Sequence, residues 1–420
     1  MKNLLSFFNG FFSRSGRHIF SATLISRLLS FLASWIALQL IPNKELGAVI
    51  YAFQIISFLI PMAGFGLNQG LLRYGSQLKL IEEKTQLFVF TLKYGVLISF
   101  FLIGALIAFS FLVDFNLKNT QFYFILLTSA ITTHFVFGLI KIQFRLLKNN
   151  KLFSFVELTY NLLFVFLVFT LSYYFKEFGY AISLILTPLI TSLLYLNKLN
   201  IKWKQDNNRL KIIDFSFWKY GFFASLSNVT TQFLFAIDII LIGSLSNNLE
   251  LVTAFKYISL FPFSLLFLSQ VVITTDFVNL TEKIYQKKYI LNYIKNYMKL
   301  FSIISIACLL FVYFFGEIIL SVFENDYVKY KSTLIVLTFG TTGILIIRGV
   351  FGNLLSAIGK AQINFVITLI ALLLNILLNY YLIPKYGILG AGITSAILMW
   401  LTGGLSALFF FYYYQNLNKY

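Results

Sequence analysis

Seven charged side chains lie inside long apolar stretches of the sequence, where charge is rare. In chain order they are Arg27, Lys93, Glu157, Asp238, Lys256, Glu317 and Arg348. If these stretches cross a bilayer, each charge costs at least about 2.5–3.5 kcal/mol at its centre, so such residues normally face a bundle interior or an aqueous cavity. The seven are too scattered to supply an acid and a base to one reaction. We therefore expect ion binding rather than catalysis.

The two arginines are suited to binding an anion. A planar guanidinium can bind a phosphate in two places, and Arg27 and Arg348 lie in the halves of their stretches nearer to the basic loops. We expect both to line a cationic cavity, with Lys256 as a candidate third member. For each of the three, neutralisation by a nearby acid or snorkelling to the lipid headgroups is the alternative.

Asp238 is placed to pair with Lys256. The two residues flank a short loop at about 244–249, and at 1.5 Å per residue both lie roughly 10 Å below its surface. We expect an ion pair that braces the second half of the chain. The alternative is a gating or proton-linked role for Asp238.

Other polar residues in the stretches have simpler interpretations. Glu157, near a helix end, could be either a partner of a base or an anchor, and Glu317 is expected to be structural. Asn375 and Asn379 share a helix face and predict hydrogen bonds between helices. His134 is expected to be a buried neutral imidazole rather than a proton relay.

These residues must be positioned by helices that cross a membrane. The 420 residues are 59% apolar and 11% charged, whereas a soluble domain is roughly 45–50% apolar and a quarter charged. A crossing helix needs about 20 apolar residues. Twelve stretches are long enough: about 19–41, 46–67, 86–112, 120–140, 153–175, 178–196, 220–243, 249–274, 300–322, 332–354, 362–383 and 388–413.

Loop charge predicts the orientation of these helices. Most of the 33 Lys and Arg residues lie in alternate loops, and such residues are retained in the cytoplasm. Because the helix count is even, both termini are predicted to be cytoplasmic. No small-residue cleavage site follows the first stretch, so we expect it to be retained as a helix. The net charge of +18 follows these loops, which argues against a nucleic-acid partner.

The chain also shows signs of an internal duplication. Glu45-Leu46 and Glu250-Leu251 occupy corresponding positions in the two halves. Six helices per half place the pseudo-two-fold axis along the membrane normal. We predict two six-helix bundles, over residues 1–200 and 201–420. Between the eighth and ninth stretches, apolar residues at helical spacing over 277–298 predict an interfacial helix on the cytoplasmic surface.

Several motifs of enzymes and metal proteins are absent from the sequence. There is no G-x-x-x-x-G-K-[ST] run for ATP, no nucleophile elbow and no H-E-x-x-H. The two histidines, His18 and His134, are far apart, and Cys308 is the single cysteine. We expect a protein that is not an enzyme and that uses no metal and no cofactor.

Three parts of the chain resemble polysaccharide biosynthesis and export proteins, the Wzx-type flippases. The resemblance follows the whole chain, helix for helix, and implies membership of the multidrug/oligosaccharidyl-lipid/polysaccharide exporter superfamily. The matching segments are Ile41–Gly47 with Ala63–Gly70 and Arg73; Ile237–Gly243, which contains Asp238; and Ala357–Lys360 with Leu374–Asn379 and Ile383–Gly392.

The resemblance implies a function as well as a fold. Its members carry an isoprenoid-pyrophosphate-linked oligosaccharide, such as an O-antigen unit of lipopolysaccharide, from the inner to the outer leaflet of the bacterial cytoplasmic membrane. The expected partners are this substrate, membrane lipids and other polysaccharide-assembly membrane proteins. A drug/cation antiporter of the same superfamily is one alternative. A membrane-embedded glycosyltransferase or polymerase of the pathway is another.

Overall fold

The computed structural model describes residues 17–113, 115, 117, 119–199, 201 and 212–417, which form helices joined by short turns with no strand among them. Nine helices in this part of the chain are long and apolar enough to cross a membrane. Shorter apolar helices cover Leu24–Leu40 and Ala236–Ser246. The predicted all-α membrane fold is confirmed.

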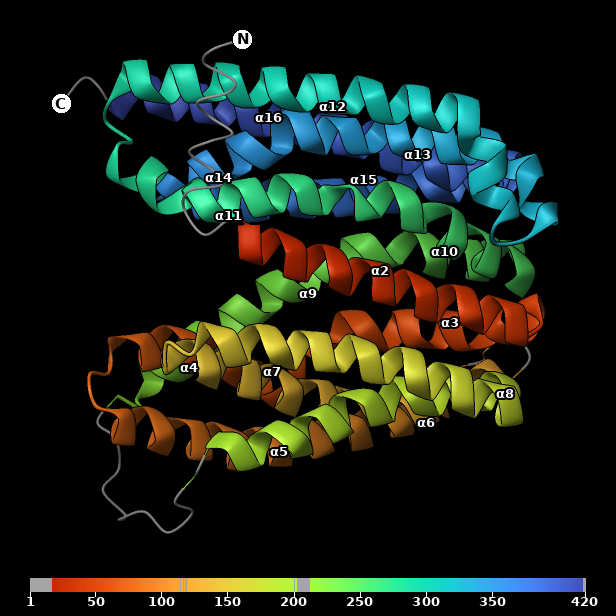
Figure 1. Cartoon of the computed structure of the whole chain (residues 1–420), viewed down its shortest axis with the longest axis horizontal. Coiled ribbons are helices and arrows are strands. Elements are labelled where there is room, and N and C mark those ends of the chain that lie inside the picture. The colour runs from red at the N-terminus through yellow and green to blue at the C-terminus, as the bar shows by residue number, and fades with distance from the viewer. Residues whose placement is uncertain are drawn as a thin grey trace. The chain divides into compact units, whose positions relative to one another are not determined.

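The helices follow the predicted stretches. The fifth and sixth stretches share α8, where the backbone at Lys176 leaves the helical region (φ 51°, ψ −130°) and turns the chain. Four other stretches, 46–67, 120–140, 249–274 and 332–354, are each built from two or three consecutive helical segments. The segments, most of them labelled in Figure 1, are α2 (Arg17–Leu40), α3 (Asn43–Leu59), η2 (Ile60–Gly66), α4 (Leu67–Gln77), α5 (Ile81–Ser110), α6 (Thr120–Thr128), α7 (Ala130–Leu146), α8 (Asn150–Leu196), η3 (Asn197–Leu199), α9 (Phe215–Ser246), α10 (Leu249–Ser264), α11 (Leu266–Glu282), α12 (Lys287–Ser321), η4 (Asn325–Tyr330), α13 (Lys331–Gly343), η5 (Ile344–Arg348), α14 (Gly349–Ala357), α15 (Ala361–Tyr386) and α16 (Ile388–Leu417).

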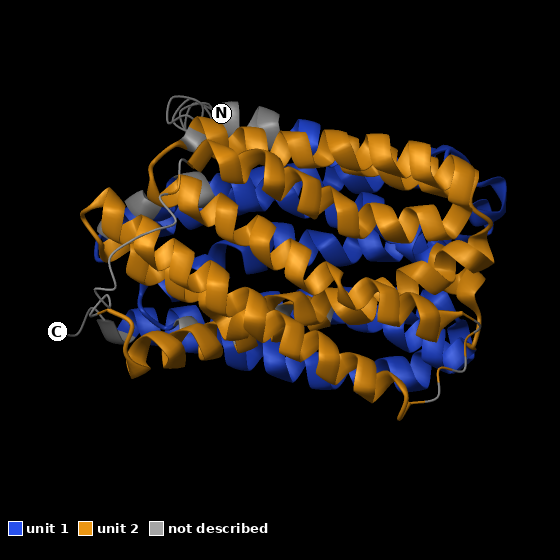
Figure 2. Cartoon of the chain, turned by 90° about the horizontal axis from the view of Figure 1, so that it is seen from below, with its two compact units in different colours: residues 1–27, 237–246, 254–420 blue, residues 28–236, 247–253 orange. Residues whose placement is uncertain are grey.

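The chain divides into two compact units, which Figure 2 shows in different colours. Unit 1 comprises residues 1–27, 237–246 and 254–420, and unit 2 comprises 28–236 and 247–253. Helices α2, α9 and α10 therefore contribute residues to both units. The units share most of their residues with the halves predicted at 1–200 and 201–420, but their boundaries differ, and the two halves stay a prediction.

Small residues allow α13 and α16 to pack closely in unit 1. A Cβ atom on Gly340 would lie 2.7 Å from the Cα of Ala396, and one on Gly343 would lie 2.9 Å from the indole of Trp400. Membrane helices associate through such small residues because lipid provides no hydrophobic drive between them. This contact positions α16 beside η5 as well as α13.

The predicted interfacial helix between the eighth and ninth stretches is wrong. Helix α11 continues to Glu282 and α12 begins at Lys287, so the segment extends the two membrane helices instead of forming a separate one. Its apolar residues Leu280, Ile284 and Ile294 are buried in a core with α14 and α16. The helical spacing was correct, but the apolar face covers protein rather than the membrane surface.

In unit 2, the second stretch is interrupted between α3 and α4. Gly64, Phe65 and Gly66 all have positive φ (61°, 48° and 78°), which a regular helix does not contain. A Cβ atom on Gly66 would lie 1.9 Å from the carbonyl oxygen of Gly221 on α9. Glycine is required at this position for both its φ and the close approach.

Candidate binding and coupling sites

Arg348 ends η5, a turn of π-helix between α13 and α14. Such turns insert one residue into a helix and are frequent at functional sites. The half-buried guanidinium donates to the hydroxyl of Ser406 on α16 and, at 3.4 Å, to that of Thr368 on α15. No ion pair of the described side chains includes Arg348. Its charge is therefore held by neutral groups.

Polar groups that the sequence did not single out lie beside this guanidinium. Asn364 of α15 donates from Nδ2 to the carbonyl oxygen of Gly352 at 2.7 Å and to the hydroxyl of Ser356 at 3.1 Å. Its Oδ1 is buried without a hydrogen-bond partner. A Cβ atom on Gly352 would lie 3.6 Å from that Oδ1 and 3.8 Å from Nε of Arg348. Glycine thus leaves room between the amide and the guanidinium.

Arg27 and Lys256 differ from Arg348 in their surroundings. Arg27 is exposed on α2, and Lys256 is half-buried on α10. Neither side chain belongs to an ion pair among the described residues. The cationic cavity formed by these three residues stays a prediction.

Asp238 of α9 lies in a buried network with α15 and α16. Its Oδ1 accepts hydrogen bonds from Nδ2 of Asn375 at 2.9 Å and Nδ2 of Asn379 at 2.7 Å, and its Oδ2 accepts one from the hydroxyl of Ser395. Asp238 as a residue is 3% exposed. An ionised carboxylate only accepts hydrogen bonds, whereas a protonated one could donate to the Ser395 hydroxyl, so these contacts are compatible with both states. The hydrogen bonds predicted for the two asparagines are present, with Asp238 as their acceptor.

The partner of Asp238 is therefore not Lys256. No ion pair between the two appears among the described residues, and the carboxylate is occupied by α15 and α16. Equal depth in the membrane was the basis for expecting that pair. Depth does not determine the direction in which a side chain leaves its helix, and the polar faces of α15 and α16 provide the donors here.

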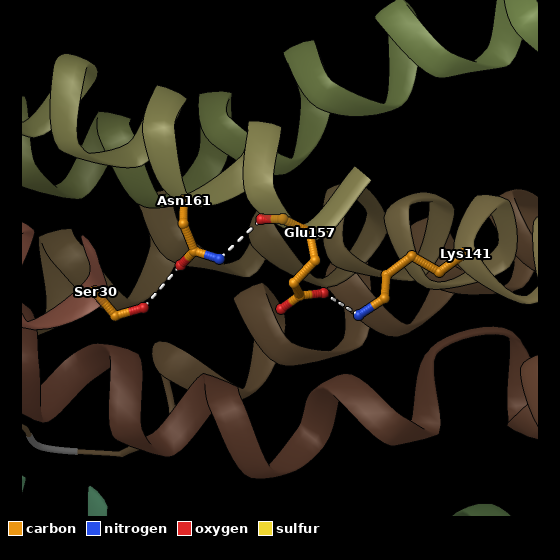
Figure 3. Close-up of polar contacts among 4 residues, drawn as sticks. All are labelled: Ser30, Lys141, Glu157 and Asn161. Carbon is orange, nitrogen blue, oxygen red and sulfur yellow. Dashed lines mark hydrogen bonds and ion pairs between the residues drawn. The ribbon is translucent and has the colours of Figure 1, made fainter. Parts of the chain in front are cut away.

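A second polar network joins α2, α7 and α8 in unit 2, as Figure 3 shows. The ammonium of Lys141 pairs with Oε2 of Glu157, and Nδ2 of Asn161 donates to the backbone oxygen of Glu157 at 2.8 Å. Ser30 donates to Oδ1 of Asn161 at 2.7 Å. Of the two interpretations of Glu157, the structure supports that of a partner to a base. Asn161 and Ser30 were not anticipated from the sequence.

The remaining polar residues have local roles. Glu317 forms an exposed ion pair with Lys331 at 2.8 Å. His134 lies beside the rings of Phe53 and Tyr160, with its Nε2 buried and unpartnered. Among the residues that the structure describes, no three His, Cys, Asp or Glu side chains group closely enough to hold a metal ion.

Comparison with known proteins gives two matches in sequence. No protein-family model matches the chain. Over 106 residues the chain is 34% identical to the capsular polysaccharide biosynthesis protein CapF of Staphylococcus aureus, a match that spans 25% of each protein. Over 393 residues it is 21% identical to an uncharacterized membrane protein of Methanocaldococcus jannaschii, covering 86% of this chain and 77% of that one.

Solved structures match over nearly the whole chain. The lipid II flippase MurJ in an inward closed conformation superposes with a TM-score of 0.73 at 20% identity, covering 92% of this chain and 86% of MurJ. An inward-facing multidrug resistance transporter of the MATE family superposes with a TM-score of 0.71 at 15% identity, covering 94% of this chain and 96% of the transporter. The chain is a multi-pass membrane protein with the fold of these MOP-superfamily transporters, whose twelve helices form two lobes.

Proposed function

We propose that this protein is a flippase for a lipid-linked oligosaccharide, a unit of O-antigen or of a similar surface polysaccharide. It would carry the isoprenoid-pyrophosphate-linked unit from the inner to the outer leaflet of the bacterial cytoplasmic membrane by alternating access. The fold is that of transporters, one of which is a lipid II flippase. The partial match to a capsular polysaccharide biosynthesis protein supports a polysaccharide unit as cargo.

The observation that carries this proposal is the environment of Arg348. Its guanidinium lies on a π-turn within a membrane-crossing segment and contacts hydroxyls instead of a carboxylate. An uncompensated cation at this depth is costly unless an anion binds to it. A pyrophosphate is such an anion, and a guanidinium matches its geometry. Arg27 and Lys256 would complete the cationic surface as the cargo moves.

Asp238 is the candidate coupling group. Its network can hold either protonation state, because the Ser395 hydroxyl can donate to the carboxylate or accept from a protonated carboxyl. The amides of Asn375 and Asn379 donate to Oδ1 in both cases. A proton taken up or released here would change the charge of unit 1 without dismantling its packing.

The test is a leaflet assay for the oligosaccharide lipid in cells that make this protein. We expect deletion of the protein to strand the oligosaccharide lipid on the cytoplasmic leaflet, and the wild-type protein to restore its crossing. The Arg348→Ala variant should insert into the membrane normally but should not restore crossing. Ser406→Ala is the matched control, since it removes a hydrogen-bond partner of Arg348 but leaves the charge. Equal failure of both variants would make Arg348 structural. Crossing that is unaffected by the deletion would overturn the proposal.

A drug/cation antiporter is the second candidate. The fold likeness to a MATE-family multidrug transporter favours it, as does the buried acid Asp238, because a carboxylate binds cations. On this alternative, deletion raises drug sensitivity, and Asp238→Asn rather than Arg348→Ala abolishes export. Measuring both phenotypes in the same strains separates the two functions.

A further inference from the structure

One face of α12 changes from basic to apolar along the helix. At 100° per residue, Lys288, Lys295, Lys299, Ile306, Leu310 and Tyr313 fall within about 60° of one another around its axis. We call this row the α12 stripe. Its three lysines are exposed, and Ile306, Leu310 and Tyr313 are 58%, 53% and 60% exposed. The stripe therefore presents an ammonium cluster directly in line with an apolar surface.

The apolar part of the stripe gives its depth in the bilayer. Exposed Ile, Leu and Tyr side chains on a membrane-crossing helix face lipid. On the same face, Glu317 pairs with Lys331 and marks the far edge of the apolar part. The 18 residues from Lys299 to Glu317 rise roughly 27 Å, close to the hydrocarbon thickness of about 30 Å. Lys299 therefore lies at the level of the headgroups, and Lys295 lies one turn, about 6 Å, beyond it.

The lysines of the stripe have no acidic partner among the described side chains. None belongs to an ion pair there, and α12 has no acid in its first turn, which holds Lys287 and Lys288. Like charges four residues apart on a helix destabilise it, so Lys295 and Lys299 repel each other. An external anion at headgroup level would offset this repulsion.

We propose that Lys295 and Lys299 bind the phosphate of an anionic phospholipid, whose acyl chains lie along Ile306 and Leu310. Lys288, farther from the hydrocarbon, extends the positive potential toward the solution. Loop charge predicts that this end of α12 is cytoplasmic, so the site would select anionic lipid from the inner leaflet. This binding site is separate from the cargo site and does not depend on the proposed function.

The single cysteine of the chain makes a direct test practical. In a Cys308→Ser background, Ile303→Cys places one thiol beside the stripe at a position that is 55% exposed. A bimane fluorophore is attached to this thiol, and its fluorescence is measured in vesicles. The vesicles contain either phosphatidylglycerol or phosphatidylcholine that carries a doxyl quencher near the headgroup. We expect phosphatidylglycerol to quench the fluorophore more strongly than phosphatidylcholine does. In the double variant Lys295→Gln/Lys299→Gln, this preference for phosphatidylglycerol should fall about fivefold for each lysine that is replaced.

Two further variants control this experiment. Lys79→Gln/Lys287→Gln removes the same charge away from the stripe, since Lys287 points about 100° from Lys288, and it should keep the preference. Lys295→Arg/Lys299→Arg should also keep it. Equal quenching by both lipids in wild type, or equal loss in the two Gln double variants, would overturn the site. Loss of phosphatidylglycerol quenching on adding an equimolar isoprenoid pyrophosphate would assign the stripe to the carrier lipid instead.

Discussion

Asn379 donates a hydrogen bond of 2.7 Å from its Nδ2 to Oδ1 of Asp238, and both residues are buried in unit 1. The contact joins α15 to α9, and Asn375 and Ser395 add α15 and α16 contacts to the same carboxylate. A buried acid is thus held by three neutral donors. We therefore expect the network to stabilise unit 1, and it surrounds the side chain that we propose as the coupling group.

Removing one donor should destabilise unit 1. We expect Asn379→Ala to cost about 1–2 kcal/mol, because the buried carboxylate loses a charge-assisted hydrogen bond. The measurement is the thermal unfolding of the purified protein in detergent. Asn353→Ala is the control, since its Nδ2 donates to the Gly349 carbonyl within its own helical segment. A similar loss in both variants would show that the Asp238 network adds no particular stability.

Asp238→Asn should separate folding from coupling. The new amide oxygen can accept from Asn375 and Asn379, and its NH2 group can donate to the Ser395 hydroxyl, so the network is preserved and the protein should insert normally. The variant mimics the protonated state and cannot titrate. We expect transport into proteoliposomes to lose its response to an imposed pH gradient. Wild-type response in a correctly inserted variant would remove Asp238 from coupling.

Gly66→Ala should be severely destabilising. The new methyl group would meet the Gly221 carbonyl at 1.9 Å, and alanine would have to adopt φ of 78°. The backbone strain alone costs about 1–2 kcal/mol, and the clash adds to it. The yield of folded protein after membrane extraction measures the effect. Gly104→Ala is the control, because no atom lies within 4 Å of its Cβ position, and its yield should be unchanged or higher.

The Lys141–Glu157 ion pair should contribute little to stability. The two side chains are 26% and 40% exposed, and pairs with such access to solvent are worth about 0–1 kcal/mol and weaken with salt. A double-mutant cycle of Lys141→Met and Glu157→Gln, read by thermal unfolding at low and high salt, measures this coupling. A coupling well above 1 kcal/mol that persists in high salt would contradict the expectation.

The sequence predicted the membrane helices well because hydrocarbon imposes one strong condition, an apolar stretch of sufficient length. The same condition says little about the direction of side chains around each helix. The depth of Asp238 was inferred from loop positions, whereas its donors lie on helices more than 130 residues further along the chain. The shared helix face of Asn375 and Asn379 was visible from their spacing, but their acceptor was not.

The polar neighbours of Arg348 show the same limit. Ser406 and Thr368 are ordinary residues in apolar stretches, and serine or threonine in a membrane helix usually bonds to its own backbone. Nothing in their sequence positions distinguishes them from the other hydroxyls. They become partners of Arg348 through the π-turn and the close packing of α13 and α16, which depends on glycines. Contacts of this kind arise from tertiary structure alone.

The break at Gly64–Gly66 has a consequence for how the protein is made. Gly66 packs against Gly221 of α9, which lies about 150 residues later in the chain. Gly221 is therefore synthesised only after six membrane segments have emerged. Until then, the interrupted backbone lies within the bilayer without its final neighbour, which is costly in hydrocarbon. We therefore expect the first six segments, made alone, to be a poor substrate for insertion and a good one for membrane proteases. Completion of α9 would mark the point in biogenesis at which unit 2 becomes resistant.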